Sequence, residues 1–358
     1  MKKIAALILM CFLLGSACWP AACADTGAKT GADALRWRDI VQISGAYNCI
    51  LGLRSDGRVL RAGSSEDYLS FDPHLDRVDA WRGIKKLFNC GGIIVGLKAD
   101  GTVVSTSDAD LSSWRNIVKV VGVKRAWLAG LKSDGTVVVT RKGELADLGW
   151  EGRSWLDTSA WQGIVDIVPE DGWTAINGLA GIRADGTVLS QYSCGMEYPE
   201  SWTDIISLCS VLDGVVGIRR DGTLALPPYD LFEDYNVTSP PEKWSNLSAL
   251  YSGHQDDLFA LTRDGRVCAA TYDDGFRLAD AVSSWRNVET LYPMYARVIG
   301  IKNDGTVLYE GNPRFCYTNA MSSWRGIREM AFYREDEQIY AVGLKTDGTL
   351  YVAQIGYS

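Results

Sequence analysis

Histidine is the scarcest functional residue in this chain, with only His74 and His254 among 358 residues. Most zinc centres and catalytic triads use histidine, so little material is available for either kind of site. The sequence also lacks a phosphate loop, a dinucleotide fingerprint and a Gly-x-Ser-x-Gly motif. We therefore expect no catalytic residues, no metal ion and no cofactor.

Basic runs are missing as well. The chain has 36 Lys and Arg against 44 Asp and Glu, a formal charge of −8. Binding to a phosphate backbone needs clustered positive charge, so we expect no nucleic-acid partner. After the first two dozen residues no apolar run is long enough to span a bilayer, so no transmembrane segment is expected in the mature chain.

The first 24 residues have the three parts of an export signal. Lys2 and Lys3 supply the charged start, residues 4–14 the apolar centre, and Ala22-Cys23-Ala24 a small-x-small cleavage site. This pattern predicts a signal peptide over residues 1–24 and an exported protein.

The same stretch offers an alternative. Gly15-Ser16-Ala17-Cys18 resembles a bacterial lipobox with Gly15 in place of the usual Leu, which would leave Cys18 lipidated and the protein tethered. Secretion, lipid anchoring through Cys18 and an uncleaved anchor all stay open. Residues 25–36 are small and polar and predict a linker. We assign residues 37–358 to one repeat domain and expect a monomer.

Helical periodicity is absent over any useful length, and a repeat of about forty residues takes its place. Each copy begins with a tryptophan and runs to Gly-[Leu/Ile]-[Lys/Arg/Thr]-x-Asp-Gly, with Ala260 in place of the first Gly in the sixth copy. The tryptophans are Trp37, Trp81, Trp114, Trp161, Trp202, Trp244, Trp285 and Trp324. The matching Asp-Gly pairs begin at Asp56, Asp100, Asp134, Asp185, Asp221, Asp264, Asp304 and Asp347.

One unit shows the expected local structure. Apolar runs after Trp285, at residues 298–301 and at residues 307–309 predict three strands. Asp304-Gly305 separates the last two, and Asp-Gly between apolar runs is a strong hairpin signal because Gly accepts positive φ. No unit has the alternating acidic residues of a Ca²⁺ loop, so we interpret the Asp-Gly pairs as turns.

A sheet of three or four strands cannot bury both its faces, so the units must stack. Radial stacking predicts an all-β fold, a β-propeller of about eight three- to four-stranded blades, or seven if a terminal unit is split across the closure. Each tryptophan would then pack between neighbouring sheets, where an aromatic ring buries about 150–250 Å².

The units from Trp81 to Val104 and from Trp114 to Val138 resemble the regulator-of-chromosome-condensation repeat family, and more narrowly its exported bacterial members. The resemblance covers the chain from about Trp37 onward and implies a propeller. The family's Gly-x-x-His-Thr signature is missing, with only His254 near its place. The nucleotide-exchange role of the eukaryotic members therefore does not carry over.

Six cysteines follow Ala24. Cys49, Cys90, Cys209 and Cys268 fall in apolar stretches, where we expect buried free thiols. Cys194 and Cys316 lie in predicted loops, and their disulfide state stays open.

The loops between first and second strands differ sharply between units, and in a ring they all emerge on one face. Aromatic and Arg side chains, which are enriched at interfaces, recur in these loops. The candidate binding residues are Tyr47, Arg125, Trp127, Trp173, His254, Asp256, Tyr295, Arg297 and Arg334. Packing between blades is the alternative for Trp127 and Trp173.

These observations favour a secreted or surface-tethered bacterial propeller that binds a protein or glycan non-covalently. A propeller hydrolase or lyase acting on carbohydrate is one alternative, and it would need paired carboxylates about 5–10 Å apart. Adjacent acids such as Glu170-Asp171 and Glu335-Asp336 are the available candidates. A structural or adhesion module of the envelope is the other alternative.

Overall fold

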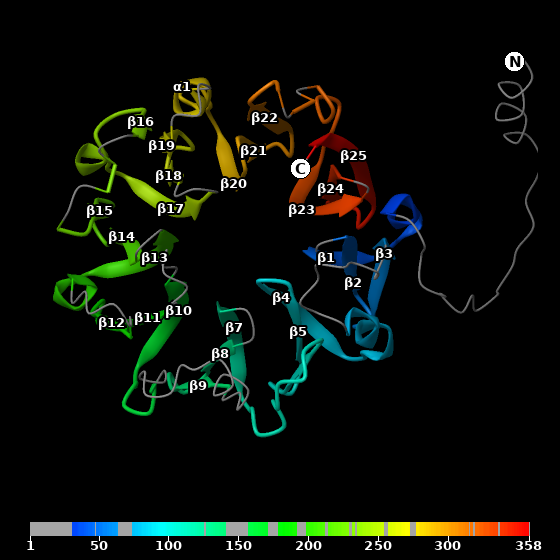
Figure 1. Ribbon diagram of the computed structural model, residues 1–358, viewed down its shortest axis with the longest axis horizontal. Coiled ribbons are helices and arrows are strands. Elements are labelled where there is room, and N and C mark those ends of the chain that lie inside the picture. Colours follow the sequence, from blue (N-terminus) through cyan, green and yellow to red (C-terminus); the bar gives the residue numbers. More distant parts are fainter. Residues whose placement is uncertain are drawn as a thin grey trace, which may run out of the picture.

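Eight antiparallel sheets surround a central opening (Figure 1). The computed structural model describes residues 31–46, 48–63, 74–124, 127–140, 157–170, 178–191, 198–211, 214–228, 231–232, 235–253, 257–272, 277–314, 316–317, 319–335 and 337–357. The expected all-β propeller is confirmed, with eight blades rather than seven.

The blades are numbered one to eight in chain order. Blades one to three consist of β1 (Ile40–Ala46), β2 (Cys49–Arg54), β3 (Val59–Gly63), β4 (Ile84–Cys90), β5 (Ile93–Lys98), β6 (Val103–Ser105), β7 (Ile117–Lys124), β8 (Trp127–Lys132) and β9 (Val137–Val139). Blades four and five consist of β10 (Ile164–Glu170), β11 (Gly178–Arg183), β12 (Val188–Ser190), β13 (Ile205–Val211), β14 (Gly214–Arg219) and β15 (Leu224–Ala225).

Blade six has four strands in the order β16-β19-β18-β17. They are β16 (Tyr235–Val237), β17 (Leu247–Ser252), β18 (Leu258–Thr262) and β19 (Val267–Tyr272). Blades seven and eight consist of β20 (Val288–Met294), β21 (Arg297–Lys302), β22 (Val307–Gly311), β23 (Ile327–Glu335), β24 (Gln338–Lys345) and β25 (Leu350–Tyr357).

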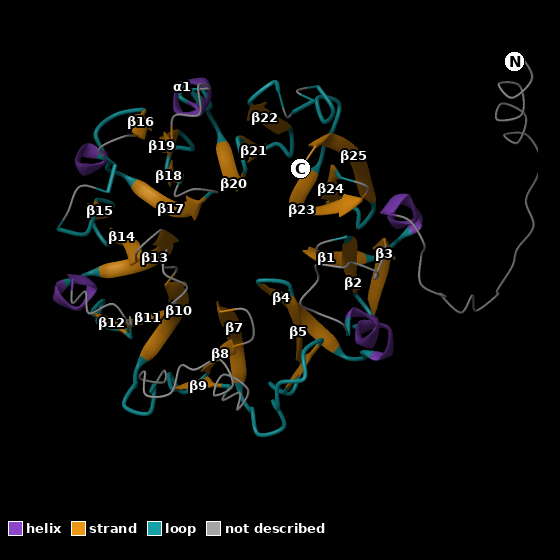
Figure 2. Ribbon diagram, viewed as in Figure 1, coloured by secondary structure: helices purple, strands orange, loops and turns teal. Residues whose placement is uncertain are grey.

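Short helices lie at the outer rim of the ring (Figure 2). They are η1 (Gly31–Arg36), η2 (Leu75–Ala80), η4 (Tyr198–Ser201), η5 (Pro241–Lys243) and α1 (Leu278–Val282). Several of them end at the residue before a repeat tryptophan, as η2 does before Trp81, so they set the direction in which the chain enters the next blade.

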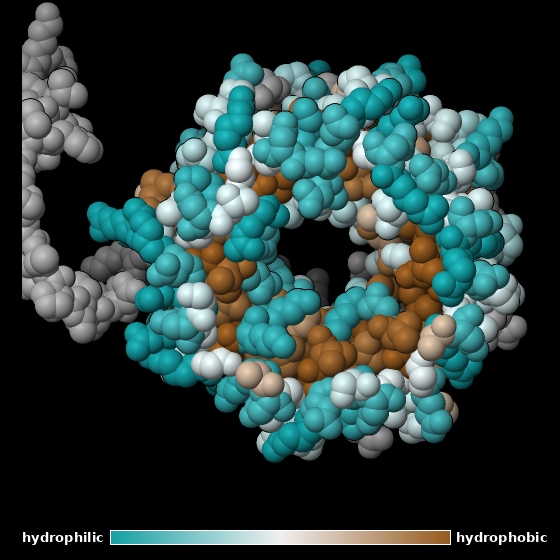
Figure 3. All heavy atoms as spheres, turned by 180° about the vertical axis from the view of Figure 1, so that it is seen from behind, coloured by the Kyte–Doolittle hydropathy of each residue, from teal (hydrophilic) through white to brown (hydrophobic). Residues whose placement is uncertain are grey.

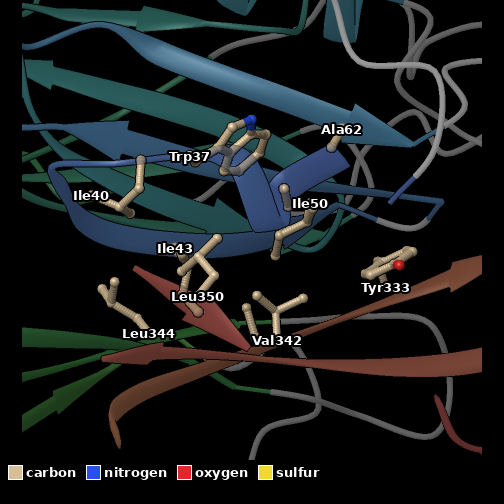
Figure 4. Packing of buried hydrophobic residues seen from close by; sticks show 11 residues of the cluster. Trp37, Ile40, Ile43, Ile50, Ala62, Tyr333, Val342, Leu344 and Leu350 are labelled. Atoms are coloured by element: carbon tan, nitrogen blue, oxygen red, sulfur yellow. The ribbon is translucent and has the colours of Figure 1, made fainter. Parts of the chain in front are cut away.

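The repeat tryptophans pack between blades as predicted. Trp37 lies in one apolar cluster with Ile43 of blade one and with Val342 and Leu350 of blade eight (Figure 4). Trp285 occupies the same place between blades six and seven. Each such ring removes a large apolar area from water, which is the main stabilising term at a blade junction.

The glycine before the motif's [Leu/Ile]-[Lys/Arg] pair leaves room for the ring of the repeat tryptophan. A Cβ on Gly300 would lie 2.8 Å from the ring of Trp285, and five other blades show the same close approach. Glycine therefore recurs here because the second strand must accept the indole face.

The Asp-Gly turns also join the blades. Gly305 has a φ of +74°, and its carbonyl accepts a 3.0 Å hydrogen bond from the backbone N–H of Ile327 in the next blade. Asp304 accepts hydrogen bonds from the N–H of Thr306 at 2.9 Å and from its hydroxyl at 2.6 Å. These bonds lower the pKa of Asp304, and they confirm the turn interpretation.

The same type of backbone hydrogen bond, from the start of one blade to the turn glycine of the blade before it, closes the ring. The N–H of Ile40 donates to the carbonyl of Gly348 at 3.1 Å, so blades eight and one meet like every other pair. Residues 31–36, within the stretch expected to be a linker, form η1, and Ala34 packs in the closure cluster with Tyr333.

The strands nearest the central opening are β1, β4, β7, β10, β13, β17, β20 and β23 (Figure 1). Side chains link neighbouring strands of this set across the blade junctions. Gln42 of β1 exchanges two 2.8 Å hydrogen bonds with the backbone of Leu87 in β4. At the closure, Glu329 takes the equivalent position and accepts the N–H of Ile43. Burial raises the pKa of Glu329 to about 7, because the carboxylate form loses its hydration there.

Candidate functional site

The first-to-second-strand hairpins emerge on one face of the ring, here called the hairpin face. The opposite face, which carries the Asp-Gly turns, is called the turn face. Four predicted binding residues of the hairpin face lie in the described part of the chain, namely Trp127, Tyr295, Arg297 and Arg334. The other five lie outside the described residues, namely Tyr47, Arg125, Trp173, His254 and Asp256.

Trp127 begins β8 and packs against the apolar cluster between blades three and four, with Val123 and Leu179. Packing between blades, the alternative considered for this residue, is what the structure shows. Arg334, near the end of β23, is exposed. The two residues are not brought together into one surface.

Arg297 lies inside the protein, with 1 % of its surface exposed. Its Nε donates to the carbonyl of Tyr295 at 3.1 Å, and its Nη2 donates to the carbonyl of Tyr357 at 3.0 Å. Arg297 therefore cannot present its guanidinium to a partner. It is a positioning residue that ties the β20–β21 hairpin of blade seven to the end of β25 in blade eight.

The two segments that Arg297 joins carry exposed tyrosines. Tyr295 is 43 % exposed, Tyr317 39 % and Tyr357 49 %. The rings of Tyr317 and Tyr357 meet edge to face with centroids 5.5 Å apart, and the N–H of Tyr317 donates to the carbonyl of Ile355 in β25 at 3.0 Å. We call these three residues the tyrosine patch.

A partly buried tyrosine and a buried cysteine contact the strand that carries Tyr357. Tyr309 of β22 donates its hydroxyl to the carbonyl of Ile355 at 2.9 Å. Burial, followed by the neighbouring Cys316 thiol, raises the pKa of Tyr309. Cys316 is buried and forms an isolated bridge with Gly356, so it too holds the chain against β25.

Nη1 of Arg297 is buried and has no hydrogen-bond partner among the described residues. Burying a guanidinium costs several kcal/mol, which hydrogen bonds must offset. Here the bonds go to the carbonyls of Tyr295, in the turn between β20 and β21, and of Tyr357, at the end of β25, and both tyrosine side chains are exposed. The arrangement gives the tyrosine patch a fixed geometry.

The remaining described cysteines behave as small apolar residues. Cys49, Cys90 and Cys209 are buried, as expected, while Cys268 is partly buried. Burial raises the pKa of Cys90 to about 12 and that of Cys209 to about 11, which leaves both thiols protonated and unreactive. Cys194 lies outside the described residues.

Apolar residues also gather around the mouth of the central opening (Figure 3). Each innermost strand contains a bulge after its first residue, and the extra residue points away from the core. In four blades this residue is a Val or Ile with 42–57 % of its surface exposed, namely Val41, Val118, Val165 and Ile206. Lys85, Ser248, Glu289 and Arg328 hold the same position in the other blades.

Carboxylate chemistry has little support in the described residues. Asp171 and Asp336, one member of each predicted acidic pair, lie outside them. Glu329 has a raised pKa, but its bond to Ile43 places it in the ring closure. Among the described residues, no group of three or more His, Cys, Asp or Glu side chains could hold a metal ion. No helix in the same residues is long and apolar enough to cross a membrane.

Two residues of the tyrosine patch could not be predicted from the residue types in the variable loops. Tyr317 and Tyr357 belong to the third-strand side of blade eight and reach the hairpin face only because β25 extends to Tyr357. The length of the last unit between Trp324 and Asp347 was the available signal, since it reflects the long β23–β24 hairpin.

No protein-family model matches the chain, and no curated protein matches it. A solved structure of the computationally designed Ika8 protein is similar, with a TM-score of 0.50 and 17 % identity, covering 90 % of this chain and 96 % of that chain. Yeast RCC1 (Prp20), solved with Kap60, has a TM-score of 0.41 and 11 % identity, covering 96 % and 85 %. Human WBSCR16 has a TM-score of 0.40 and 12 % identity, covering 90 % and 88 %.

At these identities the likeness concerns the fold alone. The eight sheets form the propeller that the resemblance of the repeats to the regulator-of-chromosome-condensation family implies, while no family model matches the chain. The chain is an eight-bladed β-propeller.

Proposed function

We propose that this propeller is an exported, non-catalytic protein that holds a protein partner non-covalently on its hairpin face, with the tyrosine patch as the centre of the contact. The observation that carries the proposal is the buried Arg297, whose two hydrogen bonds fix the segments of Tyr295 and Tyr357. Export rests on the predicted signal over residues 1–24, with Cys18 as the alternative anchor, and both lie outside the described residues.

Tyrosine suits this role physically. Its ring offers a large contact area, its hydroxyl can hydrogen-bond, and ordering its two χ angles costs little entropy. Exposed rings that are already fixed before binding reduce that cost further. A stable interface buries about 800 Å² on each partner, so the three tyrosines would form its centre and neighbouring hairpins its rim.

Stacking of a sugar on the same rings is the competing use of the patch. The edge-to-face arrangement of Tyr317 and Tyr357 breaks the surface into two inclined planes. An extended sugar platform prefers coplanar rings, so the geometry favours a protein.

Site-specific photo-crosslinking tests the proposal. A photo-reactive phenylalanine derivative is introduced at Tyr317 in one variant and at Val165, an exposed residue of blade four, in a control. In the cells that produce the protein, we expect a discrete protein adduct from position 317 and none from position 165. Adducts from position 165 alone would contradict the proposal. So would a protein that forms no adduct at 317 and is retained by a polysaccharide through the tyrosines.

A further inference from the structure

Blade six departs from the repeat at its outer edge. Its fourth strand, β16, pairs with β19 and continues to Thr238, whose N–H donates to the carbonyl of Ala269 at 2.9 Å. The hydroxyl of Thr238 accepts the N–H of Ala269 at 3.0 Å. The carbonyl of Ser239 accepts the indole N–H of Trp244 at 2.8 Å. These bonds hold residues 238–239 beside the repeat tryptophan.

A cavity of about 310 Å³ lies between this segment and the start of blade seven, on the turn face. Trp244 and Val267, both buried, form its apolar part. The polar lining consists of Thr238, Ser239, Lys243, Ser245, Thr262, Cys268, Arg266, Ser283 and Arg286.

Comparison with blade eight explains why blade six has this space. The position two residues before the Asp of the turn is Lys or Arg in seven blades and Thr262 in blade six. In blade eight this residue is Lys345, whose Nζ lies 5.2 Å from the ring centre of Tyr351. Tyr351 in turn stacks on Trp324 at 5.4 Å. Blade six has Cys268 at the position of Tyr351, so two large side chains are replaced by two small ones.

The charge at the cavity is positive. Three cations line it: Lys243, Arg266 and Arg286. Nε of Arg266 bonds to Asp264 at 3.0 Å, and Nη1 of Arg286 donates to the carbonyls of Ser283 at 2.9 Å and Trp285 at 2.7 Å. One carboxylate against three cations leaves about two positive charges in a chain whose formal charge is −8.

We propose that this cavity binds a phosphate or sulfate monoester of a sugar. The cations would hold the ester oxyanion, because charge-assisted hydrogen bonds from Arg suit phosphate and sulfate oxygens. The hydroxyls of Ser239 and Ser245 would contact the hydroxyls of the sugar, and Trp244 would contact its apolar face. The volume is about ten times the share of one water molecule in liquid, and it lies at the lower end of the range for ligand pockets.

Isothermal titration calorimetry at low salt tests the site with glucose 6-phosphate, glucose 6-sulfate, inorganic phosphate and glucose. The key variant is Arg266→Thr, which removes one lining cation and introduces the residue type that six other blades carry there, so it should fold. Arg58→Thr is the matched control, because Arg58 follows the turn glycine of blade one as Arg266 does in blade six.

We expect at least one of the two esters to bind with a Kd at or below about 1 mM and glucose to show no binding. Arg266→Thr should weaken ester binding at least tenfold, and Arg58→Thr should leave it unchanged. Binding of neither ester would overturn the proposal, and so would ester binding that survives Arg266→Thr. Inorganic phosphate binding as tightly as both esters would overturn the assignment to a sugar ester. If one of the two esters has the lower Kd, that ester identifies whether the site takes phosphate or sulfate.

Discussion

The two faces of the ring differ in how far their structure repeats from blade to blade. On the turn face, one arrangement recurs at blade after blade: a turn glycine with positive φ, its carbonyl bonded to the next blade, and a tryptophan packed at the junction. On the hairpin face, the arrangement around Arg297 and the tyrosine patch belongs to blades seven and eight, where the hairpin of one blade meets the last strand of the other.

This difference separates scaffold from surface within a single chain. Residues that recur in the repeat are buried or bonded to the neighbouring blade, so changing them should lower stability. Among the residues that differ between copies, Tyr295 and Tyr357 are exposed and Arg297 positions them, whereas Trp127 packs between blades. Variation between copies therefore marks the places where binding can occur, and the predictions below measure the two kinds of residue separately.

The largest effect should come from the turn-face scaffold. Trp285→Ala leaves a cavity between blades six and seven, so we expect the free energy of unfolding to fall by about 3–5 kcal/mol. Urea unfolding followed by circular dichroism measures this value. The exposed Val165→Ala variant, expected to stay within about 0.5 kcal/mol, is the control. If both variants unfolded like the native chain, the tryptophan would not hold the junction.

Arg297→Leu should have an intermediate effect on stability. It removes two hydrogen bonds to carbonyls, but it also relieves the cost of a buried charge. We expect a loss of about 1–3 kcal/mol, together with faster amide hydrogen exchange at residues 295–297 and 355–357. Unchanged exchange there would show that Arg297 does not fix the patch.

A smaller, pH-dependent effect should come from Glu329 at the ring closure. Its pKa is about 7 in the folded protein and has a model value of 4.5, so the folded state binds the proton more tightly. The stabilisation is full below about pH 4.5 and is lost as the pH rises through 7. We expect the free energy of unfolding to fall by about 1–3 kcal/mol across this window.

Glu329→Gln should flatten that slope. Gln42 already makes both backbone hydrogen bonds at the equivalent position between blades one and two. The variant should therefore match the native chain near pH 4.5 and exceed its stability at pH 8. Thermal melts across the pH range measure the slope, and an unchanged slope would assign it to another group.

The sequence predicted the ring well because its signals are local and repeated. Asp304-Gly305 predicts a hairpin because the glycine accepts a positive φ. The regular spacing between each repeat tryptophan, such as Trp285, and the following Asp-Gly turn predicts one buried indole ring for each blade. The candidate site was harder to predict because it depends on contacts between distant strands. Arg297 was predicted to be a binding residue, but it is buried, and its guanidinium donates to the carbonyl of Tyr357, sixty residues later. Trp127 was also predicted as a candidate binding residue of a variable loop. It packs against the apolar cluster between blades three and four.

The central claim is that binding belongs to the tyrosine patch and stability to the repeated residues. The most direct test is the affinity of the cross-linked partner for Tyr357→Ala, measured beside Val165→Ala on folded proteins of confirmed stability. We predict that Tyr357→Ala weakens binding by at least tenfold, the effect of losing an aromatic residue at the centre of an interface, with less than about 0.5 kcal/mol change in stability. Val165→Ala should bind like the native chain. Unchanged affinity in Tyr357→Ala, or a loss in Val165→Ala alone, would contradict the claim.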